Sequence, residues 1–251
     1  MKTERRRAVF LLLILGACIG AAGQSFNIDL DLSGPGELGG GAPSSSFGAA
    51  AGQAGFWNRF GLGILPQQVH DLNGNLTNVE MTKEFKGPGG GGGGFAFEGN
   101  TGDYALLLND GSDVGTVVQG GSVTYFFDGL QPSMYEVYTF AVNPVGPVDT
   151  PVYIPEAIEN QTQVVTGPMP GNSFEYLVTH SIHLVDCTGN DSFRISIVQP
   201  PGMPHNMFVN GFQVVAVPEP SSALILAAAL VLLISKRNVV ISKGEIANEV
   251  E

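Results

Sequence analysis

Residues 26–32 of the chain read Phe26-Asn27-Ile28-Asp29-Leu30-Asp31-Leu32, a strict alternation of apolar and polar side chains. Successive side chains of a β-strand point to opposite faces, so this pattern predicts a strand with one buried and one solvated face. The body of the chain has no long stretch with the 3.6-residue period of an amphipathic helix. The alternation in this strand and the lack of helical periodicity together predict an all-β protein.

Short apolar runs separated by turn residues recur along the rest of the body. Strands are predicted near residues 68–72, 76–82, 95–98, 104–108, 122–127, 135–142, 161–165, 174–185, 192–198 and 207–215. Asn73-Gly74-Asn75 is a hairpin signal, and Asn109-Asp110-Gly111 reads as a further turn. Many short strands at this spacing predict an antiparallel β-sandwich that is jelly-roll-like.

Two glycine-rich stretches interrupt this pattern. Residues 34–55 contain eight glycines, and residues 87–94 contain seven. Such segments have little apolar area to offset their ordering entropy, so we expect mobile loops. A GxGxxG pattern can be drawn through the second stretch, but no βαβ unit surrounds it, and a nucleotide-binding loop is therefore not expected.

The composition limits the class of protein. The chain has 251 residues, of which 43% are hydrophobic, enough for a packed core in one domain with appendages. Between Gln24 and Pro220 there are four basic and 19 acidic residues. Binding to a phosphate backbone needs clustered Lys and Arg, so neither nucleic acid nor an anionic lipid surface is an expected partner. Two cysteines supply no disulfide scaffold and no zinc ribbon.

Residues 1–23 have the features of a secretory signal peptide. Lys2 and the arginines at 5–7 precede an apolar run of about ten residues, which is half the length of a membrane span. Small residues at 20–23 offer a site for signal peptidase. The sequence before Cys18 also fits a lipobox, so lipidation of Cys18 is left open as an alternative.

The C-terminal end has three parts in a fixed order. Val217-Pro218-Glu219-Pro220 comes first, and its prolines favour an extended, accessible strip. The apolar run 223–234 follows and predicts a short hydrophobic helix of about 18 Å, against about 30 Å of bilayer hydrocarbon. Lys236 and Arg237 then act as a cytoplasmic stop.

This end resembles the PEP-CTERM sorting signal of exopolysaccharide-producing bacteria, with Pro218-Glu219-Pro220, residues 223–234 and the pair Lys236-Arg237 in matching order. The resemblance implies a substrate of an exosortase, a membrane enzyme that removes the tail near Pro-Glu-Pro. Residues 238–251 depart from the family, whose members usually stop soon after the basic cluster. Segments such as Phe56-Trp57-Asn58 and 210–215 also look like the β-sandwich ectodomains that precede such signals.

The expected organisation follows from these segments. It comprises a signal peptide (1–23), a β-sandwich ectodomain (24–216), a sorting signal (217–237) and a cytoplasmic tail (238–251).

Few residues in the body suggest catalysis. His180 and His183 are three apart in a predicted strand, so they should face opposite sides and cannot share a metal ion. Cys187 has no identifiable partner base and reads as a buried structural thiol. GxSxG, HExxH and P-loop motifs are absent from the sequence. Glycoside hydrolysis needs two carboxyl groups at a defined separation, and the sequence alone does not show which acids lie close together. We predict no catalytic residues and no enzyme activity.

Calcium is the one cofactor for which the sequence offers candidates. Asp110 with Asp113, or Asp186 with Asn190 and Asp191, are placed where loops of a sandwich can hold Ca²⁺. The favoured interpretation of both groups is solvent-exposed Asx turns, so no metal site is predicted.

Together these observations predict an exported cell-surface or extracellular-matrix protein of a bacterium. Its partners would be signal peptidase, exosortase, and an extracellular polysaccharide or biofilm matrix in which it is structural or adhesive, after a transient stay in the inner membrane. The alternative is a carbohydrate-binding module of the same matrix, and a surface glycoside hydrolase or lyase is a more distant one.

Overall fold

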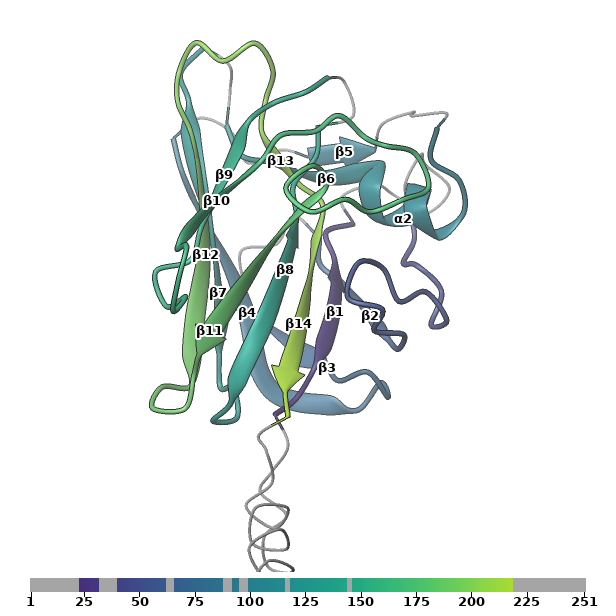
Figure 1. Cartoon of the computed structure of the whole chain (residues 1–251), viewed down its shortest axis with the longest axis vertical. Helices are drawn as coiled ribbons and strands as arrows, with labels where there is room; N and C mark the ends of the chain where they lie inside the picture. The colour runs from purple at the N-terminus through teal and green to yellow at the C-terminus, as the bar shows by residue number, and fades with distance from the viewer. Residues whose placement is uncertain are drawn as a thin grey trace, which may run out of the picture. The chain divides into compact units, whose positions relative to one another are not determined.

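The computed structural model describes residues 23–31, 40–61, 66–87, 92–94, 99–115, 118–143 and 146–218. Residues 1–22 of the predicted signal peptide, including Cys18, lie outside the described residues, and so do Glu219, Pro220, Lys236, Arg237 and the tail 238–251. So does the strand predicted at 95–98. Gly23–Val217 forms one compact structural unit (Figure 1).

Two large sheets make up this unit. Sheet A contains, in spatial order, β11 (His180–Asp186), β8 (Met134–Phe140), β14 (Gly211–Val217), β1 (Phe26–Asp29) and β2 (Trp57–Arg59). Sheet B contains β10 (Thr162–Val165), β9 (Thr150–Tyr153), β12 (Ser192–Gln199), β7 (Gly121–Asp128), β4 (Leu76–Lys86) and β3 (Gln67–His70). All neighbouring strands in both sheets are antiparallel except β1 and β2, which are parallel.

A smaller third sheet and a short helix complete the described elements. The sheet consists of β13 (Phe208–Val209), β6 (Asp110–Asp113) and β5 (Gly92–Gly94), and the helix is α2 (Asp103–Leu108). In Figure 1 they lie together at one end of the unit, beyond the ends of β8 and β14.

The core lies between sheets A and B, which pack face to face. Phe212 of β14 contacts Tyr125 of β7 edge to face, with ring centroids 4.9 Å apart, and Phe127 of β7 at 5.8 Å. All three side chains are fully buried. Figure 1 shows β8, β14 and β1 in front of β7 and β4, in agreement with these contacts. Offset and edge-to-face aromatic pairs add to the burial of apolar area that holds the sandwich together.

The prediction of an all-β fold with antiparallel sheets is confirmed. From β7 onward the chain mostly alternates between the large sheets, since β7 and β12 belong to sheet B while β8, β11 and β14 belong to sheet A. Each strand must therefore present alternate residues to a core shared with the opposite sheet. The burial along β4 and β12 shows this alternation clearly.

The hairpin predicted around Asn73-Gly74-Asn75 is also confirmed. It joins β3 to β4, and the Asp71 carboxylate accepts hydrogen bonds from the backbone N–H groups of Asn73 and Asn75, both at 2.9 Å. Gly74 has φ of 79°, a conformation that glycine adopts at little cost.

Several predicted elements were wrong. The run 104–108 forms helix α2 instead of a strand, because its Ala and Leu residues favour a helix and do not alternate. Asp110 and Gly111 begin strand β6 and not a turn, and part of the glycine-rich stretch 87–94 pairs with it as β5. Residues 174–179 form a loop before β11.

The opening strand also differs from its prediction. Both faces of β1 are buried, because the loop formed by residues 40–55 covers the outer face of sheet A at this strand. The sequence pattern missed the short strands β2 and β9 altogether. Among the described residues, no helix is long and apolar enough to cross a membrane.

Candidate functional site

The outer face of sheet A carries a continuous series of aromatic rings. We call this series the aromatic strip, and it consists of Phe47, Tyr104, Phe174, His180, Tyr138 and Tyr176. These residues come from the 40–55 loop, helix α2, the loop before β11, β11 itself and β8. The fold therefore brings five separate segments of the chain to one surface.

Neighbouring rings of the aromatic strip contact one another along its length. Tyr104 and Phe174 stack with centroids 5.0 Å apart, and Phe47 meets Tyr104 edge to face at 5.0 Å. His180 stacks on Tyr138 at 5.8 Å. Such contacts restrict the side chains, so the strip presents a preorganised aromatic surface.

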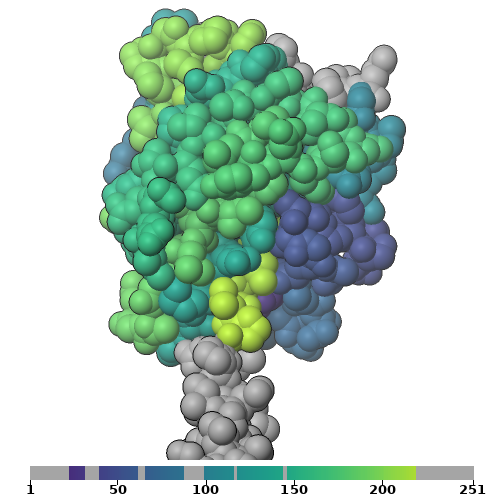
Figure 2. All heavy atoms as spheres, viewed as in Figure 1, coloured from purple at the N-terminus to yellow at the C-terminus, as the bar shows by residue number. Residues whose placement is uncertain are grey.

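The strip is open to solvent over part of its length. Tyr176 is 51% exposed, whereas the other tyrosines and both phenylalanines are half-buried. Figure 2 shows this face of the molecule, where the segment around residues 160–180 and the 40–55 loop leave part of β14 visible between them.

Hydrogen-bonding groups lie beside the rings. The Tyr138 hydroxyl donates to a carboxylate oxygen of Glu136 at 3.1 Å, and the Tyr176 hydroxyl donates to the amide oxygen of Gln163 at 3.2 Å. Burial and the neighbouring Glu136 charge raise the pKa of Tyr138 to about 12. Tyr138 therefore stays protonated at neutral pH and keeps its donor hydrogen.

The two histidines of β11 face opposite sides, as predicted. The register of β11 with β8 places His183 beside Val137 on the inner face, whereas His180 belongs to the aromatic strip on the outer face. Burial lowers the pKa of each imidazole to about 4, so both rings are neutral at neutral pH. His180 thus contributes an uncharged ring, and its Nδ1 lies 3.0 Å from the Thr179 hydroxyl.

Trp57 does not provide a stacking platform. It is only 4% exposed, and its indole N–H donates to the Phe47 carbonyl oxygen at 3.2 Å. Trp57 therefore anchors the 40–55 loop on sheet A and holds Phe47 in the aromatic strip.

The predicted sorting motif begins where the last strand ends. Val217 is the final residue of β14, and Pro218 is exposed. Strand β14 pairs with β1, so the first and last strands of the sandwich are neighbours in sheet A. Ala216 donates its backbone N–H to the Ser25 hydroxyl at 3.0 Å, which joins the two ends of the folded unit.

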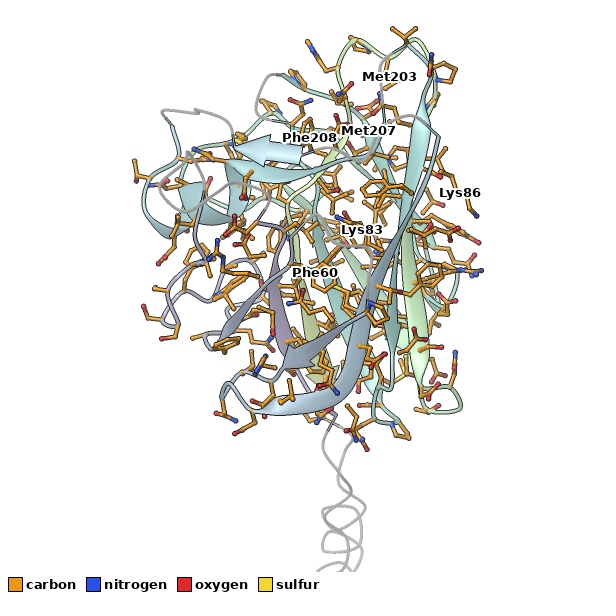
Figure 3. All side chains as sticks on the ribbon, turned by 180° about the vertical axis from the view of Figure 1, so that it is seen from behind. Phe60, Lys83, Lys86, Met203, Met207 and Phe208 are labelled. Carbon is orange, nitrogen blue, oxygen red and sulfur yellow. The ribbon has the colours of Figure 1, made fainter. Side chains whose placement is uncertain are left out.

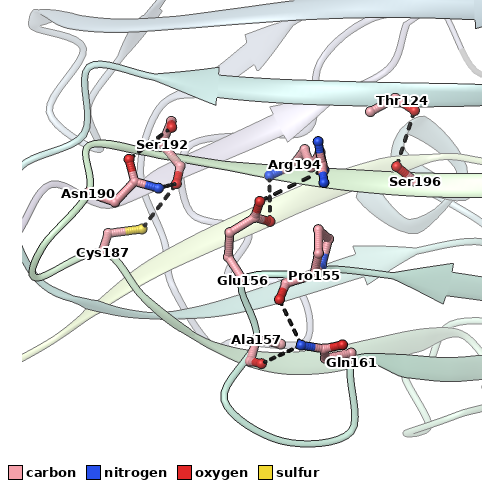
Figure 4. Close-up of polar contacts among 10 residues, drawn as sticks. All are labelled: Thr124, Pro155, Glu156, Ala157, Gln161, Cys187, Asn190, Ser192, Arg194 and Ser196. Carbon is pink, nitrogen blue, oxygen red and sulfur yellow. Dashed lines mark hydrogen bonds and ion pairs between the residues drawn. The ribbon is translucent and has the colours of Figure 1, made fainter.

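Cys187 is a buried thiol, as the sequence suggested. Its Sγ lies 3.9 Å from the Ser192 carbonyl oxygen (Figure 4). Burial, together with nearby carboxylates of which Asp186 has the largest effect, raises its pKa to about 12. A thiol in this state is a poor nucleophile, since the thiolate is the reactive form.

The loops considered for calcium do not assemble as metal sites. Asp110 and Asp113 occupy the first and last positions of β6, and Asp113 accepts a hydrogen bond from the Asn206 side chain at 2.7 Å. Asp186 accepts from the Thr188 backbone and hydroxyl, which is an Asx turn. In the part of the chain that the structure describes, no three or more His, Cys, Asp and Glu side chains group as metal ligands.

Sequence reasoning did not find the aromatic strip. Its members are separated by up to 133 positions, from Phe47 to His180, and each one read singly is an ordinary core or surface residue. Only the pairing of β8 with β11 and the position of the covering loops bring them together.

Comparisons with known proteins identify no family. No family model matches the chain, and no curated protein matches it. Among solved structures, similarity was found to a family GH115 4-O-methyl-α-glucuronidase, BtGH115A, with specificity for decorated arabinogalactans, at 16% identity and a TM-score of 0.30. That match covers 51% of this chain and 16% of the glucuronidase.

Two carbohydrate-binding modules are also similar in structure. One is Xyl-CBM35, solved with a disaccharide that contains glucuronic acid (14% identity, TM-score 0.30, 54% of this chain and 86% of the module). The other is CBM35 from Cellvibrio japonicus Abf62 (13% identity, TM-score 0.29, 55% of this chain and 95% of the module).

Proposed function

We propose that this protein is a polysaccharide-binding β-sandwich that acts outside the bacterial cell, and that the aromatic strip is its binding surface. The observation that carries the proposal is one exposed aromatic ring, Tyr176, that continues a series of half-buried rings beside fixed hydrogen-bonding groups on one face. Sugar rings present apolar C–H faces and hydroxyl edges. The exposed Tyr176 ring offers an apolar face for the first, and its hydroxyl oxygen, which Gln163 holds in place, can accept a hydrogen bond from the second.

The charge of the surface favours a neutral polysaccharide. The carboxylates beside the strip include those of Glu136, of the exposed Glu175 between Phe174 and Tyr176, and of Asp103, which accepts hydrogen bonds from Ser44. None of the four basic residues between Gln24 and Pro220 belongs to the strip. Carboxylates accept hydrogen bonds from sugar hydroxyls but repel uronic acids and sulfated sugars.

Glycan-array binding and affinity electrophoresis test this proposal with matched tyrosine variants. Tyr176→Ala removes the most exposed ring of the strip, and we expect at least a tenfold loss of affinity, equivalent to about 1.4 kcal/mol. Tyr153→Ala is the control, because Tyr153 is a 40% exposed tyrosine on the outer face of sheet B. Equal losses in both variants, or no binding by the unaltered protein, would contradict the proposal.

We further propose that the chain is exported and then processed at Val217-Pro218-Glu219-Pro220 by an exosortase-type membrane enzyme. Support comes from the position of the motif, since backbone pairing in β14 ends at Val217. A peptidase requires an extended segment, and Pro218 cannot extend the strand because it has no backbone N–H. The first residues before β1 and the last residues of β14 lie side by side, since Ala216 donates its backbone N–H to the Ser25 hydroxyl.

Intact mass spectrometry of the protein from a host with and without its exosortase tests this processing. The expected mature form ends near Pro218–Pro220, and Glu219→Ala should leave a longer chain. An extracellular form that still contains residues 224–251 in the exosortase-positive host would refute the sorting proposal. The same spectra report the N-terminal cleavage site and any lipid on Cys18.

On this proposal the protein binds polysaccharide and does not cleave it. Cys187 is buried with a raised pKa, and both β11 histidines are neutral, so none of these side chains is poised as a nucleophile or general acid. Sustained release of reducing sugars from the host's own exopolysaccharide by the pure protein would show an enzyme instead.

A further inference from the structure

Strand β11 is the outermost strand on one side of sheet A, and its sequence gives it little protection against pairing with another strand. It pairs with β8 in an unbroken register from His180 to Asp186. The strand contains no Pro, Lys or Arg, its single carboxylate is on the last residue, and Leu184 is 41% exposed. A regular edge strand with few charges is a template for a further strand.

The end of β4 in sheet B shows the ordinary kind of protection. Within the described residues, the pairing of β3 with β4 reaches Met81, and the end of β4 extends beyond it. That end carries Glu84 and Lys86, whose charged groups are 3.6 Å apart, and Lys86 points away from the body (Figure 3). Charged side chains disfavour an incoming strand, because pairing would remove them from water. Strand β11 has no such pair of charges.

The backbone of β11 is covered on its free side. In an antiparallel pair, the carbonyl groups of every second residue point away from the neighbouring strand, and on β11 these residues are His180, Ile182 and Leu184. Each of the three carbonyls accepts a hydrogen bond from a group outside sheet A. The donors, in the same order, are the Leu177 backbone N–H (2.8 Å), the Gln163 side-chain amide (2.5 Å) and the Ile158 backbone N–H (2.9 Å).

Gln163 of β10 makes the central contact of this cover. Its side-chain amide donates to the Ile182 carbonyl oxygen and also accepts the Ile182 backbone N–H at 3.0 Å. A primary amide has the same donor and acceptor as a peptide group, so Gln163 takes the place of a neighbouring strand at this residue. Gln163 is only 9% exposed. Because β10 is the edge strand of sheet B, this contact joins the edges of the two sheets.

A second buried amide makes the same kind of contact at the opposite edges of the sheets. Asn58 of β2 donates to the His70 carbonyl oxygen at 2.9 Å and accepts the His70 backbone N–H at 2.8 Å. Asn58 is 4% exposed, and His70 belongs to β3, the other edge strand of sheet B. One buried amide therefore closes each of the two gaps between sheets A and B.

Residues 155–163, which we call the strap, run from the end of β9 into β10 and contact both sheets. Glu156 pairs with the Arg194 side chain of β12 at 3.8 Å and accepts the Arg194 backbone N–H at 3.2 Å (Figure 4). On the other side, Ile158 and Gln163 bond to β11. The strap is thus fixed on sheet B and covers the free side of β11.

We propose that Gln163 holds the strap on β11 and so prevents this edge from pairing with β11 of a second copy of the chain. Two copies of one regular strand can pair antiparallel about a two-fold axis, which satisfies both edges at once. Loss of the Gln163 amide leaves a donor and an acceptor of Ile182 free for such pairing. The inference does not depend on the glycan site, because Tyr176→Ala removes a separate bond to Gln163 and leaves both bonds to Ile182 in place.

Amide hydrogen exchange and light scattering test this role on the full chain and on variants prepared in the same way. The unaltered protein should be a monomer with a slowly exchanging Ile182 N–H. Gln163→Leu should exchange this hydrogen at least about tenfold faster and should form dimers as its concentration rises. Gln161→Leu is the matched control, because the exposed Gln161 amide donates to the Pro155 carbonyl within the strap, and it should show neither effect (Figure 4).

An Ile182 N–H that exchanges in the unaltered protein as fast as an exposed amide would overturn the proposal, whatever the variants do. Gln163→Leu that remains monomeric, or Gln161→Leu that associates equally, would also overturn it. If Gln163→Leu does not fold, Gln163→Glu replaces it, since this variant keeps the size and the acceptor but places a carboxylate oxygen against the Ile182 carbonyl. It should show the same two effects, and a monomer with a protected Ile182 N–H would contradict the role of the amide.

Discussion

Acid should destabilise this protein through His183, a fully buried imidazole on the inner face of β11. Burial lowers its pKa to about 4, whereas an imidazole in the unfolded chain titrates near 6.5. Between these values the unfolded chain binds the proton and the folded chain does not. The stability that depends on His183 is therefore fully present well above pH 6.5 and is lost as the pH decreases toward 4.

The two pKa values give the size of the effect. Lowering the pH from 7.5 to 4.5 should cost about 2.5 kcal/mol of unfolding free energy through this one group. Carboxylates and His180 add their own contributions, so the effect of His183 must be isolated by difference. The variant His183→Leu has no titrating group at this position and replaces the imidazole with an apolar side chain of similar size.

Urea unfolding at pH 7.5 and pH 4.5 measures the difference. We expect His183→Leu to lose about 2.5 kcal/mol less than the unaltered protein between the two pH values. His205→Leu is the control, because His205 lies half-buried in the loop before β13, and this variant should follow the unaltered protein. If His183→Leu and the unaltered protein lose the same free energy, His183 is not buried as an unprotonated ring.

Three further predictions concern the core, one turn and the thiol. Phe212→Ala should lower the unfolding free energy by about 3–5 kcal/mol, because it opens a cavity between the sheets, whereas Val198→Ala on the exposed face should change it by less than about 0.5 kcal/mol in urea titrations. Gly129→Ala should lower the unfolding free energy by more than about 1 kcal/mol, because φ is 82° and the added β-carbon would lie 2.5 Å from the Asn78 carbonyl oxygen. Gly189→Ala is the control, because a β-carbon there meets open space, and its Tm should stay close to that of the unaltered protein. Cys187 should react with a thiol reagent only after unfolding, and Cys187→Ser should remove that signal; fast labelling of the native protein would contradict its burial.

The sequence was informative about the strands because their patterns are local. The alternation in 192–198 and the turn at Asn73-Gly74-Asn75 depend on neighbours within a few residues, and both predictions hold in the structure. The errors arose where tertiary contacts override local preference. The pairing of Gly92–Gly94 with β6 makes a strand from residues that have no side chains to pack.

The candidate sites were harder to predict from the sequence than the fold was. The register predicts that His180 and His183 face opposite sides, but it does not say which side meets Tyr138. The burial of Asp29 could not be predicted either, because the alternating pattern of its strand placed this polar residue on the solvated face.

The sequence by itself determined that the body is an acidic, strand-rich domain with few basic residues. Composition and period-two alternation are properties of the chain alone. Tertiary structure decided which polar residues of β1 are buried and which aromatic rings form one surface. The physical reason is that burial and ring contacts depend on segments more than fifty positions apart, and only the packing of loops and α2 over sheet A fixes those distances.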